Sequence, residues 1–354
     1  MTARKILILG ASYGSLLAVK LALAGHAVRL VCLPAEAKLI NEKGAIVRMP
    51  VRGREGLVEV NSRGLPGKVT AGGTEGADPK GYDLVVLAMQ EPQYGSAGVR
   101  ELLQAVAASR VPCMSIMNMP PLPYLARVPG IDAARCRDAY SDPAVWDAFD
   151  PKTMTLCSPD PQAFRPPDQE VNVLQVRLPT NFKAARFDSE KDTALLREIA
   201  AGVEAARFDV GGEKIELPVK LKVHDSVFVP LAKWAMLMAG NYRCVQADTV
   251  RSIRDTVHGD LAGSRAVYEW VVELCVSLGA SRDDMVPFDK YANAALSLQS
   301  PSSAARALAA GAQRIERVDR LVQAVGAQHG KRSAAIDEIV SLVDAWLVRN
   351  RHKG

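Results

Sequence analysis

Short apolar runs alternate with amphipathic stretches along the first third of the chain. The runs are each ended by a turn or a polar residue, which predicts buried parallel strands. They are ILILG (6–10), AVRLVCL (27–33), DLVVLAM (83–89) and VPCMSIMN (111–118). Helical patterns lie between them at about 15–24 and 98–109. This alternation implies a parallel sheet with right-handed crossovers.

The middle of the chain has a weaker pattern. Residues 53–73 predict short hairpin-like strands, and 119–130 are too rich in proline for regular structure. A proline-punctuated excursion is expected near residues 140–165. A strand is then predicted at 170–178 and a helix at 191–206.

From about Pro218 the pattern is helical. The segment AAIDEIVSLVDAWLV (334–348) has apolar residues at the spacing of an amphipathic helix. Helices are predicted at 224–240, 260–279, 284–297, 302–326 and 333–350. We therefore expect an α/β sheet domain over residues 1–215, followed by an all-helical substrate and dimerisation domain over 216–354.

Composition narrows the class of protein. The 354 residues are 48% hydrophobic and 23% charged with a net charge of +5, as in soluble globular proteins. No run reaches the roughly 18 apolar residues of a membrane span. The six cysteines form no C-x-x-C pair, and the basic tail RNRHKG is typical of a solvated chain end. We expect a cytoplasmic protein that binds no metal, nucleic acid or membrane.

The segment after the first strand predicts an anion site. A strand, a tight glycine turn and a helix N-terminus together attract a phosphate through backbone N–H groups and the helix dipole. Ser12 and Ser15 occupy positions where the G-x-G-x-x-G fingerprint has glycines. A sheet domain of this kind that has lost its nucleotide is the alternative. The residues expected at the pyrophosphate are Gly10, Ser12, Tyr13, Gly14 and Ser15.

The end of the second strand bears on which dinucleotide binds. An acidic residue there hydrogen-bonds the ribose 2′-hydroxyl of NAD, whereas a basic residue accommodates the 2′-phosphate of NADP. This chain has Leu33 and Pro34 at that point, with Glu36 and Lys38 just beyond. Both NADP(H) and NAD(H) therefore stay open as cofactors.

Several segments, in order, resemble the ketopantoate reductase (2-dehydropantoate 2-reductase) family. The resemblance implies a Rossmann-type domain joined to a helical domain, and hydride transfer from a nicotinamide to a 2-keto acid. The segments are ILGASYGSLLAVKLALAGHAVRLV (8–31), INEKGAIVR (40–48), YDLVVLAMQEPQ (82–93), SIMNMPP (115–121), VPLAKWAMLMAGNYRCVQA (229–247) and SPSSAARALAAGAQRIERVDRLVQAVG (300–326).

The resemblance also implies roles for individual residues. Lys233 corresponds to the general acid, and Asn118 to the residue beside nicotinamide and substrate. Asn241 and Ser303 correspond to substrate-binding residues, although Ser302 or Ser303 could instead cap the following helix. The acidic substrate-binding residue of the late helix corresponds to Glu316, while strict spacing would place Arg317 there.

The chain departs from the family at several of these positions. Leu33 stands in place of the arginine that binds the 2′-phosphate, and Gln90 in place of a lysine near the cofactor. We expect Leu33, Met89 and Gln90 to lie beside the cofactor and to discriminate weakly between NADPH and NADH. Leu237 replaces a substrate-binding asparagine, and Met119 replaces a glycine, so the substrate is expected to differ from ketopantoate.

Two other functions stay open from the sequence. An opine-type dehydrogenase or imine reductase would share the domain arrangement but use a histidine, for which His224 and His258 are the candidates. A nucleotide-binding sensor without catalysis is the other. The favoured prediction is a reductase of a small carbonyl substrate, with the later amphipathic helices able to form a homodimer.

Overall fold

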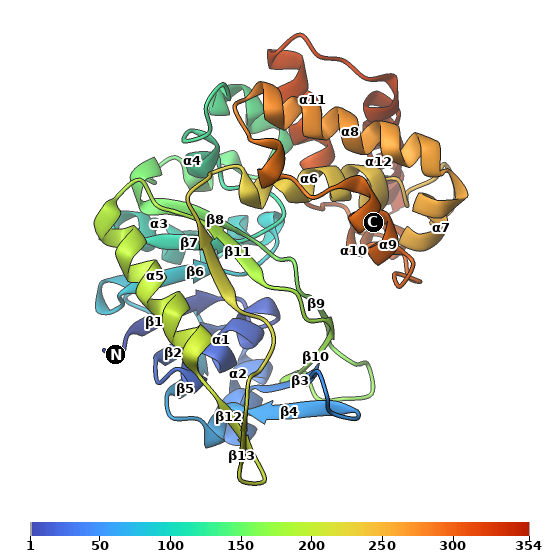
Figure 1. Cartoon of the computed structure of the whole chain (residues 1–354). Helices are drawn as coiled ribbons and strands as arrows, with labels where there is room; N and C mark the ends of the chain where they lie inside the picture. The colour runs from blue at the N-terminus through green and yellow to red at the C-terminus, as the bar shows by residue number, and fades with distance from the viewer. Residues whose placement is uncertain (1, 354) are drawn as a thin grey trace. The chain divides into compact units, whose positions relative to one another are not determined.

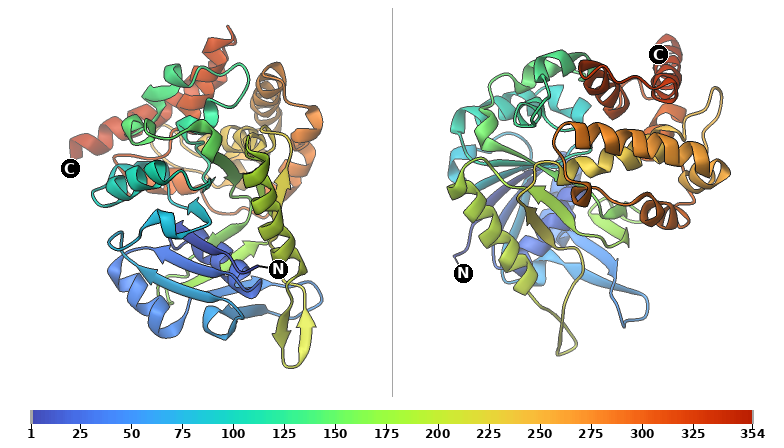
Figure 2. Two further views of the ribbon diagram at one scale, coloured as in Figure 1. Left: turned by 90° about the vertical axis from the view of Figure 1, so that its left-hand side faces the viewer. Right: turned by 45° about the horizontal axis from the view of Figure 1, so that its top comes forward.

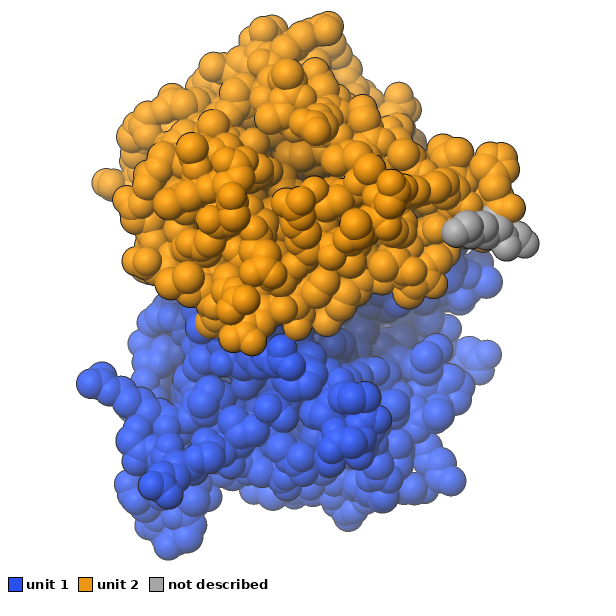
Figure 3. Space-filling view, turned by 90° about the vertical axis from the view of Figure 1, so that its right-hand side faces the viewer, with its two compact units in different colours: residues 1–89, 93–117, 145–225 blue, residues 90–92, 118–144, 226–354 orange. Residues whose placement is uncertain are grey.

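The computed structural model describes residues 2–353, which form two compact units (Figure 3). Unit 1 comprises Met1–Met89, Gln93–Met117 and Val145–Asp225, and unit 2 comprises Gln90–Pro92, Asn118–Ala144 and Ser226–Gly354. Each unit draws on separate stretches of sequence. The predicted division into residues 1–215 and 216–354 stays a prediction.

The main sheet of unit 1 has eight strands. In spatial order they are β14 (Leu221–His224), β11 (Phe182–Ala185), β8 (Met154–Ser158), β7 (Cys113–Ile116), β6 (Leu84–Leu87), β1 (Lys5–Leu9), β2 (Ala27–Val31) and β5 (Lys68–Gly72). The strands from β5 to β8 are mutually parallel, and β11 runs antiparallel to β8. The parallel strands have the order of a doubly wound dinucleotide-binding sheet. The predicted α/β, Rossmann-type fold class is thus confirmed.

Helices cover this sheet, which explains why its central strands are almost entirely apolar. Ile6, Leu7, Ile8 and Leu9 of β1 are all fully buried. Figures 1 and 2 show α5 lying beside α1, and α5 also packs against β14. The helices of unit 1 are α1 (Tyr13–Leu23), α2 (Pro34–Lys43), α3 (Val99–Ser109) and α5 (Glu190–Ala205).

Two smaller sheets complete unit 1. A four-stranded sheet contains, in order, β4 (Leu57–Asn61), β3 (Ile46–Pro50), β10 (Val173–Leu178) and β9 (Gln162–Phe164). The hairpin of β12 (Phe208–Val210) and β13 (Glu213–Ile215) projects from one end of the unit (Figure 1).

The middle of the chain differs from the sequence prediction in two respects. Only half of the segment 53–73 forms a hairpin: β4 pairs with β3, whereas β5 joins the main sheet parallel to β2. Gly67 makes this path possible, since a Cβ there would lie 2.2 Å from the backbone oxygen of His26. The expected excursion also contains a buried sheet strand, β8.

Unit 2 is mainly helical, as predicted, but its helix boundaries differ. The helices are α4 (Leu122–Leu125), α6 (Lys233–Met236), α7 (Ile253–Gly259), α8 (Leu261–Ser277), α9 (Phe288–Ala295), α10 (Ser303–Ala309), α11 (Val318–Gln328) and α12 (Ala334–Lys353). The predicted helix 224–240 begins too early, because His224 ends β14, and it continues as a π-helix over Leu237–Tyr242. Along residues 2–353, no helix is long and apolar enough to cross a membrane.

The predicted helix 302–326 is wrong, because the chain breaks it into α10 and α11. Gly311 follows α10 with φ +91, a left-handed conformation that commonly terminates helices. The chain between Gly311 and Val318 is therefore not helical. As a result, Glu316 lies in the segment that precedes α11 instead of on a helix.

Candidate functional site

The glycine turn after β1 packs tightly against the end of β6. Gly10 has φ +103, and its N–H donates to the carbonyl of Val31 at 2.8 Å. A Cβ on Gly10 would lie 2.6 Å from both the Ala88 oxygen and Met89 Cγ. The fold thus brings Gly10 and Met89 together at the point where the strand order reverses, which is where doubly wound sheets bind ligands.

At the start of α1, the residues at the fingerprint positions do not play the parts that glycines play there. Ser12 is the N-cap of α1. Ser15, in the third glycine position, is buried and donates its hydroxyl to the Ala11 carbonyl at 2.5 Å. The close packing of helix on strand falls instead to Gly14, where a Cβ would lie 2.9 Å from Ile8 Cγ2. This strand, turn and helix terminus fit the pyrophosphate of a dinucleotide.

The residues that follow β2 lead into α2 at the same end of the sheet as the glycine turn. Leu33 is the N-cap of α2 and is 75% exposed. Glu36, by contrast, is buried and forms an ion pair with Arg165. Sequence reasoning missed Arg165, since nothing in the local pattern indicates a contact between residues 129 positions apart.

A pocket of unit 2 gathers four of the predicted substrate-side residues. It contains about 390 Å³ of empty space, including its open mouth. Its lining residues are Gln90, Asn118, Leu237, Asn241, Tyr242, Ser303, Ala304, Ala307, Ile315 and Glu316. Amides, hydroxyl groups and a carboxyl group thus converge on one cavity with apolar walls. This is the usual composition of a small-molecule site.

Glu316 is the buried acid of this pocket. Its Oε1 accepts the N–H of Glu91 at 3.2 Å, and its Oε2 lies 3.4 Å from Asn118 Nδ2. The pKa of Glu316 is raised to about 7, mainly by burial and also by the nearby Glu91 carboxyl, while these hydrogen bonds act in the opposite direction. The protonated form is therefore well populated at neutral pH.

The other oxygens around Glu316 show where a ligand could bind. Within residues 2–353, Asn118 Oδ1 and Glu91 Oε2 are buried and have no hydrogen-bond partner. A buried, unsatisfied acceptor is costly. Asn118, which lines the pocket, therefore offers an acceptor for a ligand hydroxyl or N–H group.

The π-helix presents one wall of the pocket. Leu237, Asn241 and Tyr242 all lie on this segment. The Tyr242 hydroxyl donates to the Glu316 carbonyl at 2.6 Å and accepts the N–H of Val318 at 3.1 Å. Because π-helical turns often occur at functional sites, this segment would have been a useful signal, but the sequence pattern did not show it.

The structure separates the roles of the adjacent serines. Ser302 is the N-cap of α10: its Oγ accepts the N–H of Ala305 at 3.1 Å and donates to the Asn241 carbonyl at 2.7 Å. Ser303 is exposed and lines the pocket. The capping role that the sequence left open for either serine thus belongs to Ser302.

Lys233 lies on the same helical segment as the pocket wall. It is the half-buried first residue of α6, one turn before Leu237, but it is not among the lining residues. Its role as general acid stays a prediction. Arg317, the alternative to Glu316, is buried in ion pairs with Asp319 and Asp344, which assigns it to the core.

Other candidate groups lie elsewhere. The lining residues, all within the described part of the chain, include no histidine. His258 Nε2 lies 2.9 Å from the Ala292 carbonyl oxygen, and His224 is part of β14. Over residues 2–353, no group of three or more His, Cys, Asp or Glu side chains is arranged to hold a metal ion.

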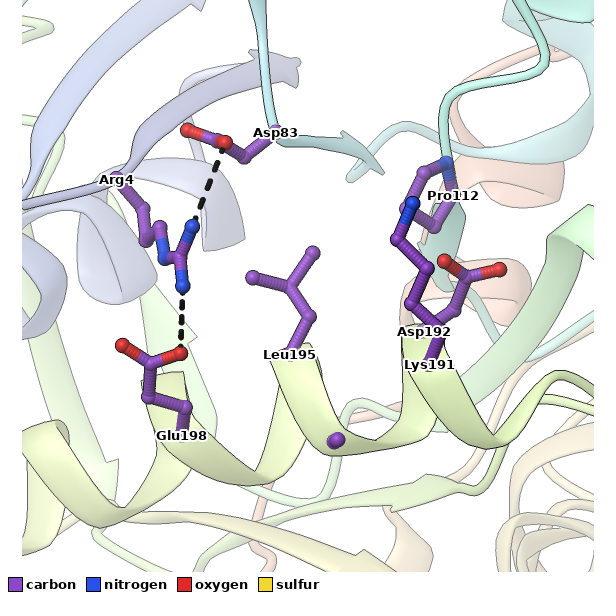
Figure 4. A pocket seen from close by; sticks show the side chains of 8 residues that line it. Arg4, Asp83, Pro112, Lys191, Asp192, Leu195 and Glu198 are labelled. Carbon is purple, nitrogen blue, oxygen red and sulfur yellow. Dashed lines mark hydrogen bonds and ion pairs between the residues drawn. The ribbon is translucent and has the colours of Figure 1, made fainter. Parts of the chain in front are cut away.

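A second pocket, in unit 1, lies at the opposite ends of the strands. Figure 4 shows Arg4 between Asp83 and Glu198, with which it forms ion pairs at 3.8 and 2.6 Å. Arg4, Asp83 and Pro112 each precede a strand of the main sheet. Doubly wound sheets bind ligands at the carboxyl ends of their strands, whereas this pocket lies at the amino ends.

Comparisons with known proteins agree with this architecture. No family model and no curated protein matches the sequence. Solved structures do match, although at low identity. The 2-dehydropantoate 2-reductase from Methylococcus capsulatus is 14% identical, with a TM-score of 0.65 over 98% of this chain and 97% of that chain.

Two further structures have similar scores. D-mandelate dehydrogenase with NADH and anilino(oxo)acetate is 14% identical, with a TM-score of 0.63 over 98% of this chain and 99% of that chain. Dimeric ketopantoate reductase from Staphylococcus aureus is 10% identical, with a TM-score of 0.60 over 98% of this chain and 99% of that chain. This chain therefore has the fold of the ketopantoate reductases.

Proposed function

We propose that this protein is a nicotinamide-dependent reductase of a 2-keto acid or related carbonyl compound, a divergent member of the ketopantoate reductase family. The observation that carries the proposal is the unit 2 pocket. Asn118, Asn241, Ser303 and Glu316 come from three distant parts of the sequence, and all four line it. A fold that had lost its chemistry would have no need to keep these polar groups together.

The two units would divide the work. Unit 1 would bind the dinucleotide through the Gly10 turn and the start of α1, and unit 2 would bind the carbonyl substrate. The cofactor would supply the hydride. The structure of D-mandelate dehydrogenase holds NADH together with an oxo acid derivative, anilino(oxo)acetate, which supports this class of substrate.

The residues of this chain would bind the substrate and donate a proton to its carbonyl oxygen. Reduction of a carbonyl develops negative charge on its oxygen, so a proton donor or positive charge is needed there. Lys233 would supply that proton as general acid. Asn241 and Ser303 would bind polar groups of the substrate, and Asn118 and Glu316 would bind a further hydroxyl or N–H group. We also propose that the enzyme is a homodimer, as the Staphylococcus aureus ketopantoate reductase is.

The substrate is expected to be less polar than ketopantoate on one side. Leu237 presents an apolar side chain to the pocket at the position where the family has an asparagine. This arrangement favours a keto acid with an apolar substituent there.

A substrate panel tests the proposal. Purified protein is mixed with NADPH or NADH and with 2-keto acids, other carbonyl compounds and imines, while cofactor oxidation is followed and cofactor binding is measured separately by calorimetry. Oxidation driven by a 2-keto acid supports the reductase. Oxidation with imines alone would favour the opine or imine type. Cofactor binding without any turnover would favour a sensor, and no binding of either cofactor would refute a dinucleotide site.

A further inference from the structure

The last residue of β2, Val31, and the two residues after it, Cys32 and Leu33, carry no positive charge. Arg29, the cation within β2, donates from its Nη2 to the Glu75 carbonyl at 3.1 Å. A 2′-phosphate on the adenosine ribose would come to the end of β2 in a doubly wound sheet. Leu33, at the strand end, is exposed and apolar. A positive charge at the end of β2, where such a phosphate would lie, would therefore have to come from another segment.

Arg165 supplies such a charge. Its Nη2 pairs with Glu36, the third residue of α2. It also lies close to Cys32, the residue after β2: burial raises the pKa of the Cys32 thiol to about 11, and the Arg165 guanidinium acts in the opposite direction. A guanidinium from a segment 129 residues away thus sits at the end of β2 and the start of α2.

The residues just before Arg165 contact both α1, which follows the Gly10 turn, and the neighbouring strand β10. Burial raises the pKa of the Tyr13 hydroxyl, at the start of α1, and the backbone of Ala163 lies close enough to act in the opposite direction. Phe164 pairs with Gln175 of β10, and the Arg177 guanidinium lies 4.1 Å from the centroid of the Phe164 ring. The segment 162–165 therefore touches both elements expected to bind the dinucleotide, α1 and α2.

The burial of the ion pair indicates which partner faces solvent. The side chain of Glu36 is 9% exposed, whereas that of Arg165 is 34% exposed. Glu36 engages one terminal nitrogen of Arg165, and a guanidinium has five N–H donors in a fork that matches a phosphate. The buried carboxylate thus anchors the arginine and leaves donors for an anion.

We propose that Arg165 recognises the ribose 2′-phosphate of NADP(H), with Glu36 as the residue that positions it. The inference rests on the proposed dinucleotide site of unit 1. In this chain the cation at the phosphate would follow β9, instead of following β2 as in the usual arrangement. The protein is therefore expected to bind NADPH more tightly than the residues at the end of β2 would indicate.

The test uses a pair of nucleotides that differ only in the 2′-phosphate, adenosine 2′,5′-bisphosphate and 5′-AMP. Their dissociation constants are measured by calorimetry for the full chain at fixed salt. For Arg165→Met, we expect the bisphosphate to bind at least about tenfold more weakly and 5′-AMP to be nearly unaffected. Arg165→Lys should retain part of the preference, because it keeps the charge but loses the fork.

Two further variants serve as controls. Lys38→Met removes an exposed cation from the same helix and should leave both dissociation constants unchanged. Arg165→Met leaves the buried Glu36 carboxylate without its ion-pair partner. The double variant Glu36→Gln/Arg165→Met therefore removes both charges. The double variant should lose the preference for the bisphosphate to the same extent. Thermal melting checks that each variant is folded.

The outcomes separate this inference from the proposed function. Loss of preference in Lys38→Met but not in Arg165→Met would assign the phosphate to Lys38 and overturn the inference. Equal weakening of both nucleotides in Arg165→Met would reduce Arg165 to a structural role. Wild-type protein that binds NADH and 5′-AMP but gains nothing from the 2′-phosphate would overturn the inference alone. Failure to bind any of these nucleotides would overturn the proposed function as well.

Discussion

Gly10 approaches the backbone of Ala88 so closely that a Cβ on Gly10 would lie 2.6 Å from the Ala88 oxygen. Gly10 also has φ +103, which disfavours any L side chain. Gly25, which follows α1 as Gly10 precedes it, has a comparable φ of +89, but no atom of residues 2–353 outside its neighbours lies within 4 Å of its Cβ position. A comparison of substitutions at the two glycines therefore separates the cost of backbone strain, present at both, from the cost of a steric clash, present only at Gly10.

Gly10→Ala should be more damaging than Gly25→Ala. Strain alone predicts that Gly25→Ala lowers the free energy of unfolding by about 1–2 kcal/mol. Gly10→Ala adds a backbone clash, so we expect a larger loss, together with at least about tenfold weaker dinucleotide binding. Denaturant unfolding and calorimetry measure the two effects. Equal losses of stability in the two variants, with dinucleotide affinity intact, would contradict the assigned role of Gly10.

The neighbouring serines of α10 should respond to substitution in opposite ways. Ser302→Ala removes the helix cap and the hydrogen bond to the Asn241 carbonyl, so the free energy of unfolding should fall by about 1–2 kcal/mol. Ser303→Ala changes an exposed side chain and should cost less than about 0.5 kcal/mol. It should instead raise KM for the carbonyl substrate several-fold. A stability loss confined to Ser303→Ala would reverse this assignment.

The sheet could be predicted where the strands are buried on both faces. The runs that form β1 and β6 are apolar throughout, and each was recognised from the sequence. The strand β8 was missed although all five of its residues are buried. Its Thr155 hydroxyl donates to the Ala185 carbonyl at 2.7 Å. That partner satisfies a polar group inside the sheet, and it belongs to a strand 30 residues away.

The substrate-side residues could be named from the sequence, but their surroundings could not. The resemblance selected Asn118, Asn241, Ser303 and Glu316, and they line one pocket. The sequence placed Glu316 on a helix, because the apolar pattern runs through the break at Gly311. Contacts between distant segments, such as Glu36 with Arg165, depend on the tertiary fold and leave no local signal.

Lys20 should make the stability of the protein depend on pH. This lysine of α1 is 2% exposed and donates to the Leu217 and Pro218 carbonyls at 2.9 and 3.0 Å. Burial lowers the pKa of Lys20 from 10.5 to about 8. Between these values the unfolded chain binds more protons than the folded one, so stability rises with pH. The free energy of unfolding of the wild type, minus that of Lys20→Met, should increase by about 1–2 kcal/mol between pH 8 and 10. A flat difference would show that Lys20 is not desolvated.

Glu316 should control the pH dependence of catalysis. Its pKa of about 7 means that it is mainly protonated below that pH and ionised above it. An ionised carboxylate repels the carboxylate of a 2-keto acid, so kcat/KM should fall by about tenfold as pH rises through 7. Glu316→Gln should abolish this transition. Glu91→Gln should move it to lower pH, because the nearby Glu91 carboxyl raises the pKa of Glu316. A transition near pH 7 that persists in Glu316→Gln would assign it to another group.

Lys233 should affect turnover without affecting cofactor binding. Lys233→Met keeps an apolar stem of similar length but removes the ammonium group, so the protonation of the developing alkoxide loses its donor. General acid catalysis typically contributes about 10²–10⁴-fold, and kcat should fall by that factor in rapid kinetics at saturating substrate. The dissociation constant of the reduced cofactor should stay within about twofold of the wild type. Lys290→Met, which changes an exposed lysine of α9, provides the matched control and should leave kcat unchanged. If kcat of Lys233→Met matches that of the control, the proton must come from elsewhere, and Glu316, protonated below about pH 7, becomes the donor to examine next.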